Sequence, residues 1–125
     1  MDAKGYTIAI LTLPNGKSII RENYVNYGDP NPVKVFGIEY DSWHAEARCM
    51  YSLTQNPYYK KLAETEGEIN ITVLRYNKNG NMTNNSHPCD KCMRMFRVVK
   101  DKYFNGKIKI NLQYMKDGNM TKEVI

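Results

Sequence analysis

Runs of apolar and β-branched residues predict two paired strands at the start of the chain. The first strand is expected over Tyr6–Leu13, and Asn15-Gly16 indicates a tight hairpin into a return strand that begins at 18–20. Gly, Asp and Pro residues make 24–32 a loop, because they disfavour both helix and strand. Residues 33–40 are expected to form a short strand or an extended approach to the next element.

The same pattern predicts three more strands further along the chain. Residues 68–76 are expected to form a buried strand, followed by a polar loop over 77–86. From Ile108 onward, Ile and Leu alternate with Lys, Asn and Gln, which is typical of a strand with one buried face. Asp117-Gly118 then indicates a hairpin turn into a last strand over 119–125.

A first helix is predicted to begin near Ser42 or Trp43, with Asp41 or Ser42 as its N-cap, and to continue until Pro57 breaks it. Residues 60–66 are expected to add a further helical turn or two. A second helix is predicted after Pro88, where apolar side chains recur at i, i+3, i+4 and i+7; they are Cys89, Cys92, Met93, Phe96 and Val99.

These elements follow the order β-β-α-β-α-β-β, which predicts an α/β fold with helices packed on a mixed sheet. The chain has 125 residues, 42% of them hydrophobic and 25% charged, so a single globular domain over 1–125 is expected. No apolar run is long enough to span a membrane, and no apolar leader follows Met1, so we expect a cytoplasmic protein without membrane contact. A net charge of +5 favours a polyanionic partner.

Two short segments, each opening a predicted helix, carry the candidate chemistry. The first is Trp43-His44-Ala45-Glu46, and the second is Ser86-His87-Pro88-Cys89-Asp90-Lys91-Cys92. Both histidines, two of the three cysteines and the single tryptophan of the chain fall within them. A Cys-x-x-Cys pair alone is a weak signal, but the combination His-x-Glu … Pro-Cys-x-x-Cys is specific.

The spacing of these residues suits a metal ion. Cys89 and Cys92, three apart at a helix N-terminus, point to the same side, and the positive end of the helix dipole favours their thiolate forms. His44 can supply a third ligand, which leaves the fourth tetrahedral position to water, as in catalytic zinc sites. Glu46 would then lie near that water without being a ligand and could transfer its proton.

On these two motifs the sequence resembles the cytidine deaminase-like superfamily of zinc-dependent nucleobase deaminases. The resemblance implies a cytidine deaminase-like α-β-α sandwich with a mixed five-stranded sheet and an antiparallel C-terminal hairpin. It also implies a Zn²⁺ cofactor held by His44, Cys89 and Cys92, with Glu46 as the catalytic proton shuttle. The implied reaction is hydrolysis of cytosine to uracil, and adenine remains open as the base because the motif is shared.

Three features separate this chain from the better-known branches. Free cytidine deaminases usually have Cys where this chain has His44. APOBEC enzymes have Trp-Ser-Pro-Cys where this chain has Ser86-His87-Pro88-Cys89, so their Trp is replaced by Ser86. The Asp117-Gly118 turn joins the last two strands, whereas APOBEC and tRNA deaminases place a helix there. The sequence is therefore most similar to toxin-type nucleic-acid deaminases. We expect a monomer acting on single-stranded or flipped-out cytosine, in DNA rather than RNA by a small margin; the alternative is an oligomeric deaminase of free cytidine or deoxycytidylate.

The resemblance also suggests which side chains contact substrate. A sugar-binding Asn on the loop before the ligand His would be Asn31 or, second, Asn26. Trp43 could stack on a base or pack beneath the site, and His87 could contact substrate or be merely exposed. The other expected substrate contacts flank the ligands within the two motifs and are Ala45, Ser86 and Pro88.

Other interpretations of the same residues stay open. Cys89 and Cys92 could form half of a structural zinc site or a dithiol, although no second Cys/His pair would complete four ligands. Cys49 is expected to be a small buried apolar residue. Seven basic side chains could follow a phosphate backbone or form a solvated helix face; they are Lys91, Arg94, Arg97, Lys100, Lys102, Lys107 and Lys109.

Overall fold

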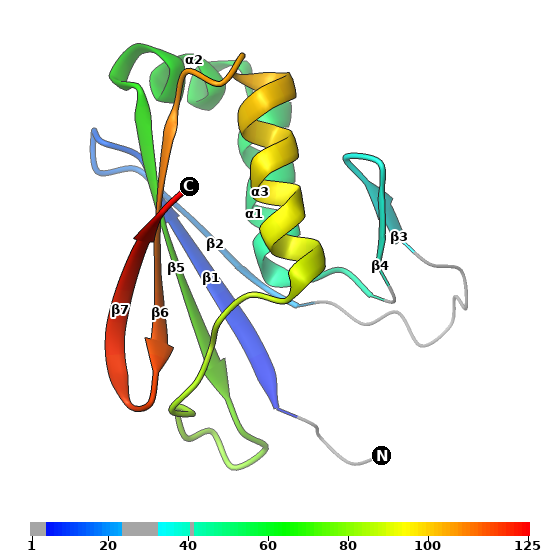
Figure 1. Ribbon diagram of the computed structural model, residues 1–125, viewed down its shortest axis with the longest axis vertical. Coiled ribbons are helices and arrows are strands. Elements are labelled where there is room, and N and C mark those ends of the chain that lie inside the picture. The colour runs from blue at the N-terminus through cyan, green and yellow to red at the C-terminus, as the bar shows by residue number, and fades with distance from the viewer. Residues whose placement is uncertain (1–4, 24–32, 41) are drawn as a thin grey trace.

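The computed structural model describes residues 5–23, 33–40 and 42–125, and it contains a five-stranded mixed sheet (Figure 1). The strand order is β2-β1-β5-β6-β7; β5 and β6 are parallel, and every other neighbouring pair is antiparallel. The expected mixed sheet and C-terminal hairpin are thus confirmed. The strands are β1 (Tyr6–Thr12), β2 (Ser18–Glu22), β5 (Glu68–Tyr76), β6 (Lys109–Lys116) and β7 (Asn119–Val124).

Three helices and a small separate hairpin complete the described part of the fold. The helices are α1 (Ala45–Gln55), α2 (Pro57–Glu66) and α3 (Asp90–Tyr103). The hairpin joins β3 (Val33–Val35) to β4 (Ile38–Tyr40) and stands beside α3, which packs against β4 (Figure 1). None of the helices in the described ranges is long and apolar enough to cross a membrane.

The core lies between the sheet and helices α1 and α3. Alternate side chains of β5 and β6 are fully buried on this face, among them Ile69, Ile71, Ile110 and Leu112. Helix α1 covers β1 and β2, helix α3 packs on β6, and the two helices contact each other. Burial of these aliphatic side chains, each worth roughly 1.5–3 kcal/mol, holds the two helices in fixed positions on the sheet.

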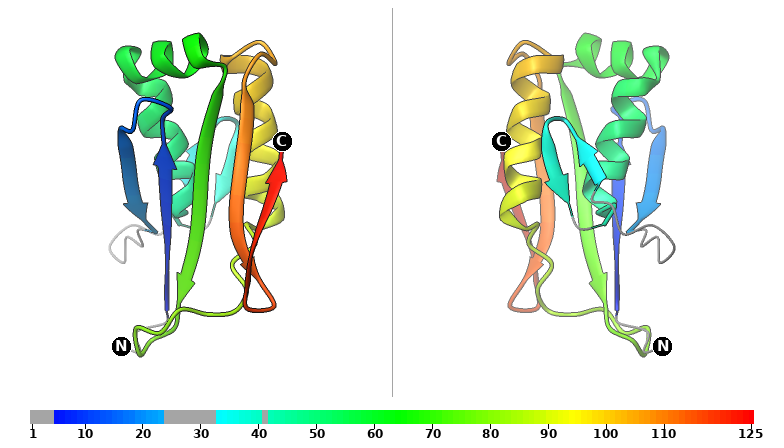
Figure 2. Two further views of the ribbon diagram at one scale, coloured as in Figure 1. Left: turned by 90° about the vertical axis from the view of Figure 1, so that its left-hand side faces the viewer. Right: turned by 90° about the vertical axis from the view of Figure 1, so that its right-hand side faces the viewer.

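The expected α-β-α arrangement is wrong for the residues that the structure describes. Both α1 and α3 lie on the same face of the sheet, and α2 crosses the end at which β5 begins (Figure 2). No described helix covers the opposite face, where Asn70, Thr72, Asn111 and Gln113 point outward. Thr72 donates a hydrogen bond to Gln113 Oε1 at 3.2 Å there. Because such polar side chains tolerate contact with solvent, this face of the sheet needs no covering helices, and one layer of helices on one sheet is enough to form the core.

Two local expectations also need correction. Pro57 begins α2 instead of only ending α1, because Pro is well suited to the first helical position and Asn56 Oδ1 accepts from the backbone N–H of Tyr58 and of Tyr59. The segment over 33–40 forms a hairpin and not one strand. Its turn places both Phe36 (φ 53°) and Gly37 (φ 77°) in the left-handed region, as tight hairpins require.

Candidate metal centre and catalytic cavity

The N-termini of α1 and α3 meet near the carboxyl end of β5, and their N-cap residues are His44 and Cys89. Both N-caps have extended backbone (φ −68° in each), but neither side chain bonds its own helix. The predicted N-cap Ser42 is therefore wrong, and the alternative Asp41 lies outside the described residues. The side chains of His44 and Cys89 do not cap their helices, because their potential metal-binding atoms, Nδ1 and Sγ, are directed at each other.

Three ligand atoms converge at this point. His44 Nδ1 lies 3.6 Å from Cys89 Sγ and 3.6 Å from Cys92 Sγ, and all three atoms lie within 4.8 Å of one another. A tetrahedral zinc ion with ordinary Zn–N and Zn–S bonds would hold nitrogen and sulfur about 3.6 Å apart. The donor set and its spacing therefore fit zinc, and the predicted ligand cluster is confirmed as a possible metal site.

The surroundings of Cys92 determine whether its sulfur is a thiol or a thiolate. Burial raises the pKa of the Cys92 thiol well above its ordinary value, and the nearby Glu46 carboxylate raises it further. A hydrogen bond from the Tyr40 hydroxyl opposes this shift, and the Tyr40 ring lies 4.7 Å from the His44 ring. A bound divalent cation would reverse the balance and stabilise the thiolate. Tyr40 thus contacts two of the three ligands.

A fourth ligand is not found in the described part of the chain. Cys49, the remaining cysteine, is fully buried and donates weakly to the Ala9 carbonyl at 3.3 Å; burial raises its pKa to about 12. This confirms the prediction that Cys49 is a small buried apolar residue. His87 Nε2 lies 3.4 Å from Glu123 Oε1, turned toward the C-terminal hairpin. A zinc ion held by these three side chains alone would keep one tetrahedral position for water, as catalytic zinc sites do.

Glu46 lies beside the three ligand residues without joining them. Its side chain is only 3% exposed, and it lines a cavity of about 110 Å³ together with His44, Ala45 and Cys89. A carboxylate that opens on a cavity offers its oxygens to a molecule bound there.

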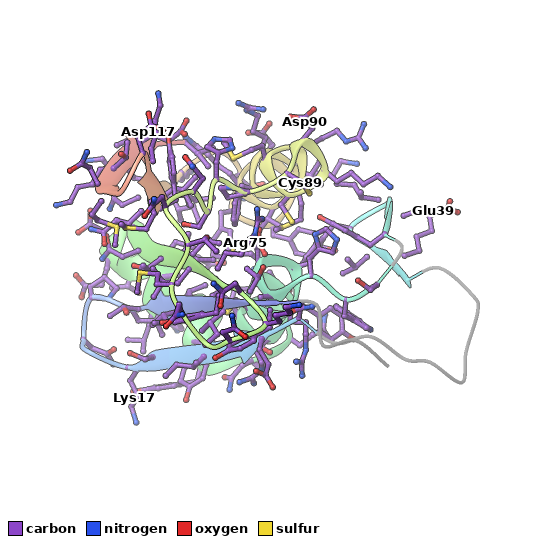
Figure 3. The ribbon with its side chains drawn as sticks, turned by 90° about the horizontal axis from the view of Figure 1, so that it is seen from below. Lys17, Glu39, Arg75, Cys89, Asp90 and Asp117 are labelled. Atoms are coloured by element: carbon purple, nitrogen blue, oxygen red, sulfur yellow. The ribbon has the colours of Figure 1, made fainter. Side chains whose placement is uncertain are left out.

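The cavity has a second wall that the sequence did not reveal. Thr7 and Asn23 line it from the start of β1 and just after β2, and Arg75 lines it from the end of β5. Asn23 Oδ1 accepts from the Thr7 backbone N–H at 2.9 Å, and Arg75 Nε donates to Thr7 Oγ1 at 3.5 Å. Figure 3 looks onto this end of the molecule and shows Arg75 beside Cys89. No local pattern marks these three residues, because separate strands bring them together.

The structure locates the predicted substrate contacts in different places. Ala45 lines the cavity, whereas half-buried Trp43 lies in a different hollow, against Tyr51. Pro88 is buried directly before the N-cap of α3, as predicted. Asn26 and Asn31 lie outside the described residues, so their assignment stays a prediction.

His87 and Ser86 both bind to the sheet. The His87 ring stands edge-to-face on Tyr114 with centroids 4.7 Å apart. Ser86 is fully buried; its hydroxyl donates to the Val73 carbonyl at 2.7 Å and accepts from the Met115 N–H at 2.8 Å. These bonds fix the segment that leads into Cys89, a structural task that the motif did not predict.

Replacing Ser86 by alanine is expected to lower the free energy of unfolding by about 1–3 kcal/mol, because the part-buried Met115 N–H loses its acceptor and the Val73 carbonyl loses its donor. Urea unfolding followed by circular dichroism measures this loss. Ser18→Ala on exposed β2 is the matched control and should change stability by less than about 0.5 kcal/mol. Equal effects of the two substitutions would contradict the bridging role.

The basic run of the sequence does not line the cavity. Lys91, Arg94 and Arg97 are exposed on α3, opposite its buried stripe, which agrees with a solvated helix face. Lys100 Nζ donates to the Ile125 carbonyl at 3.0 Å. The basic side chain that lines the cavity, among the residues that the structure describes, is Arg75 and not a member of this run.

Comparisons with known proteins identify no relative for this arrangement. No family profile matches the chain, and neither a curated protein nor a solved structure shows significant similarity to it. The fold and the metal cluster therefore rest on the residues themselves.

Proposed function

We propose that this protein is a zinc-dependent hydrolytic deaminase that converts cytosine to uracil in single-stranded nucleic acid. The observation that carries the proposal is the position of Glu46, buried on the same cavity as His44 and Cys89 but outside the ligand set. A metal centre with an adjacent free carboxylate is the arrangement that activates water and moves its proton.

The residues of the cavity have separate tasks in this reaction. Zinc held by His44, Cys89 and Cys92 would supply the Lewis acidity that makes water a nucleophile near neutral pH. Glu46 accepts a proton from the water whose oxygen attacks C4 of cytosine, and passes it to N3. The carboxylate then takes the remaining proton from the new C4 hydroxyl and gives it to the exocyclic amine, so that the C4–N bond breaks, ammonia leaves and the C4 carbonyl of uracil forms.

The size of the cavity supports a single heterocyclic ring as the reacting group. About 110 Å³ is well below the roughly 300–1,000 Å³ of pockets that enclose drug-sized ligands. A base stacked in a duplex could not enter such a recess, so the nucleotide must be single-stranded or flipped out. This favours a strand whose cytosine alone enters, while its sugar and phosphates stay at the mouth.

Two side chains at the mouth suit those outer groups. Arg75 is exposed at the end of β5, and its guanidinium can bind a phosphate oxygen. Asn23 uses its Oδ1 on the Thr7 N–H, which leaves its amide N–H groups for a sugar hydroxyl. The alternative function, deamination of deoxycytidylate, has the same support, because Arg75 could bind its single phosphate.

The proposal is tested by incubating the zinc-loaded protein with single-stranded DNA, duplex DNA, RNA, cytidine and deoxycytidylate in parallel. Mass spectrometry then measures conversion of cytosine to uracil. We expect the single-stranded oligonucleotides to react fastest. Turnover of the free nucleotide alone would favour the alternative, and no conversion of any substrate would overturn deamination of cytosine.

Replacing Arg75 by glutamine is expected to raise the KM for a single-stranded oligonucleotide about tenfold, the effect of losing one charged hydrogen bond to phosphate. The salt dependence of KM should also become shallower by about 0.7 in a log–log plot. Steady-state kinetics at about 50 and 200 mM salt measure both effects. Lys61→Gln removes an equal charge on exposed α2 and should leave both unchanged; equal effects of the two would exclude a contact at Arg75.

A further inference from the structure

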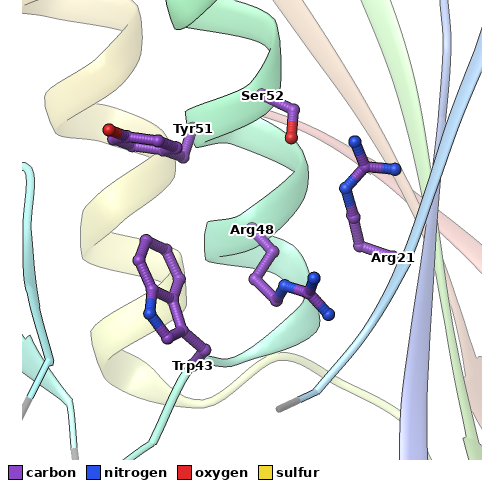
Figure 4. A pocket seen from close by; sticks show the side chains of 5 residues that line it. All are labelled: Arg21, Trp43, Arg48, Tyr51 and Ser52. Carbon is purple, nitrogen blue, oxygen red and sulfur yellow. The ribbon is translucent and has the colours of Figure 1, made fainter.

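We propose that a groove on the outer flank of α1 binds one nucleotide of the single strand, next to the cytosine in the catalytic cavity. The α1 groove is lined by Arg21, Trp43, Arg48, Tyr51 and Ser52 and has a volume of about 320 Å³ (Figure 4). The assignment of the neighbouring base rests on the proposed function. The groove itself is a separate site, because none of the described residues lines both the groove and the catalytic cavity.

Two aromatic rings form one side of the groove. Trp43 and Tyr51 stand edge-to-face with ring centroids 5.6 Å apart, one before α1 and the other two turns into it (Figure 4). Tyr51 is 43% exposed although it is large and apolar in most of its surface. Exposed aromatic faces of this kind stack on nucleobases without regard to sequence.

Two guanidinium groups occupy the other side. Arg21 reaches in from β2 and Arg48 from α1, and both lie across the groove from the aromatic rings (Figure 4). Arg48 Nη1 donates to the Glu22 carbonyl at 2.6 Å, and Arg21 Nη1 donates to the Ile20 carbonyl at 2.9 Å. These bonds orient planar forks that match phosphate geometry. No acidic side chain lines the groove within the described ranges, so its charge complements a phosphate.

The groove also continues along the edge of the sheet. A neighbouring hollow of about 520 Å³ shares Arg21 and Arg48 and adds Ile8, Ile20 and Glu22. Among the described residues that line this hollow, Glu22 carries the carboxylate, and its backbone carbonyl accepts from Arg48. Both arginines line both hollows, and Arg21 could bind the phosphate that links successive nucleotides.

The position of Trp43 connects the groove to the catalytic cavity. Trp43 lies in the chain between Ser42 and His44, and both of those neighbours line the catalytic cavity while Trp43 lines the groove. Adjacent Cα atoms are about 3.8 Å apart, so the short segment 42–44 contributes to both recesses and places them next to each other. When the cytosine of a single-stranded nucleic acid enters the cavity, the base of the neighbouring nucleotide can therefore contact the Trp43 ring.

Aromatic rings opposite paired guanidiniums match a nucleotide better than other partners. A lipid headgroup or free phosphate would use the arginines but not the rings, and an apolar peptide would use the rings but not the arginines. Single-stranded nucleic acid uses both, through stacking and phosphate contacts. DNA and RNA share this chemistry, and separate titrations with each distinguish them.

The single tryptophan of the chain makes the groove directly observable. The zinc-loaded Glu46→Gln variant, which should bind without turnover, is titrated with a short pyrimidine single strand of DNA or of RNA while tryptophan fluorescence is recorded. We expect saturable quenching, because a base stacked on Trp43 shares its π-face. Cytidine and inorganic phosphate, offered separately at the same concentration, should quench little.

Matched variants then identify the contributing side chains. Tyr51→Ala is expected to weaken oligonucleotide binding, measured by anisotropy of a labelled strand, by about 5- to 150-fold, which is the range for one stacked base. Arg21→Gln should weaken it about tenfold and make the salt dependence shallower. Tyr58→Ala and Lys17→Gln, an exposed tyrosine on α2 and an exposed lysine in the β1–β2 turn, should each change binding less than twofold.

Three outcomes would overturn binding of the strand in the groove. One is saturation with the strand while Trp43 fluorescence stays constant, and a second is equal binding by the Tyr51, Arg21 and control variants. If the strand does not bind at all, the groove proposal is overturned as well. The proposed deaminase function can then still be tested by measuring the deamination of free cytidine. Quenching by a strand that is never deaminated would instead leave the groove standing and refute the proposed function, so the two failures are distinguishable.

Discussion

Replacement of Glu46 by glutamine is expected to lower kcat for cytosine deamination by about 10²–10⁴-fold, the range for a positioned acid/base group. The amide has nearly the same shape as the carboxylate but cannot accept and return the proton. Because Glu46 is not a ligand, the zinc content and the fold should be preserved. Single-turnover deamination, metal analysis and circular dichroism measure these three quantities.

Glu39→Gln serves as the control for this substitution. Glu39 is an exposed carboxylate on β4, close in sequence to the site but not among the residues that line the cavity. Its loss should leave kcat within twofold of the unmodified protein. Near-normal activity of Glu46→Gln would remove Glu46 from the mechanism, and loss of zinc from that variant would instead assign it a role in holding the metal.

Substitution of either candidate cysteine ligand by alanine is expected to abolish stable zinc binding. The purified protein should contain about one zinc per chain, as three converging ligands imply. Cys89→Ala and Cys92→Ala should fall close to none, since two remaining ligands cannot hold the ion against a chelator. Atomic absorption after dialysis, with the melting temperature in parallel, measures the effect, and the loss of metal should lower that temperature because the ion binds only the folded chain.

Cys49→Ala is the natural control, because it removes the third cysteine without touching the cluster. Cys49 is buried between α1 and the sheet, with its thiol near the carbonyls of Ala9 and Ile19. This variant should lose some stability but keep one zinc per chain. Retention of zinc by Cys89→Ala, or its loss from Cys49→Ala, would contradict the ligand assignment.

Acid should release the metal by protonating the buried Cys92 sulfur. Cys92 has its pKa raised by burial and by Glu46 when no ion is present, so protonation competes effectively with zinc at this sulfur. Affinity is therefore expected to fall as the pH is lowered and to rise as it is increased, until the thiolates form without competition. A site built from exposed carboxylates alone would show the same sign but would hold metal down to lower pH, because carboxylates have lower pKa values than thiols.

The sequence by itself determined the local elements and the chemistry of the ligands. Alternation over 68–76 and a helical stripe after Pro88 are local regularities, so they were readable without knowing what each segment packs against. The two motifs carried the ligand types and the free carboxylate for the same reason: His44 with Glu46, and Cys89 with Cys92, are each separated by only two or three positions.

Some local features were misread because their signals depend on context. Pro57 can end one helix or begin the next, and only the cap from Asn56 decides in favour of a second helix. Phe36-Gly37 does not resemble a favoured hairpin turn, yet pairing of Val35 with Ile38 holds Phe36 at positive φ. His44 was not recognised as an N-cap because its side chain serves the cluster and not the helix.

The tertiary structure alone decided what surrounds the ligands. Packing of α1 and α3 on one face of the sheet brings together side chains 45 and 48 positions apart in the chain, at 3.6 Å. Thr7, Asn23 and Arg75 become one wall because β1 pairs with both β2 and β5, and no spacing along the chain encodes that neighbourhood. Local periodicity reports which face of an element is buried, whereas a cavity depends on which elements are neighbours, and that follows only from burial of the whole core.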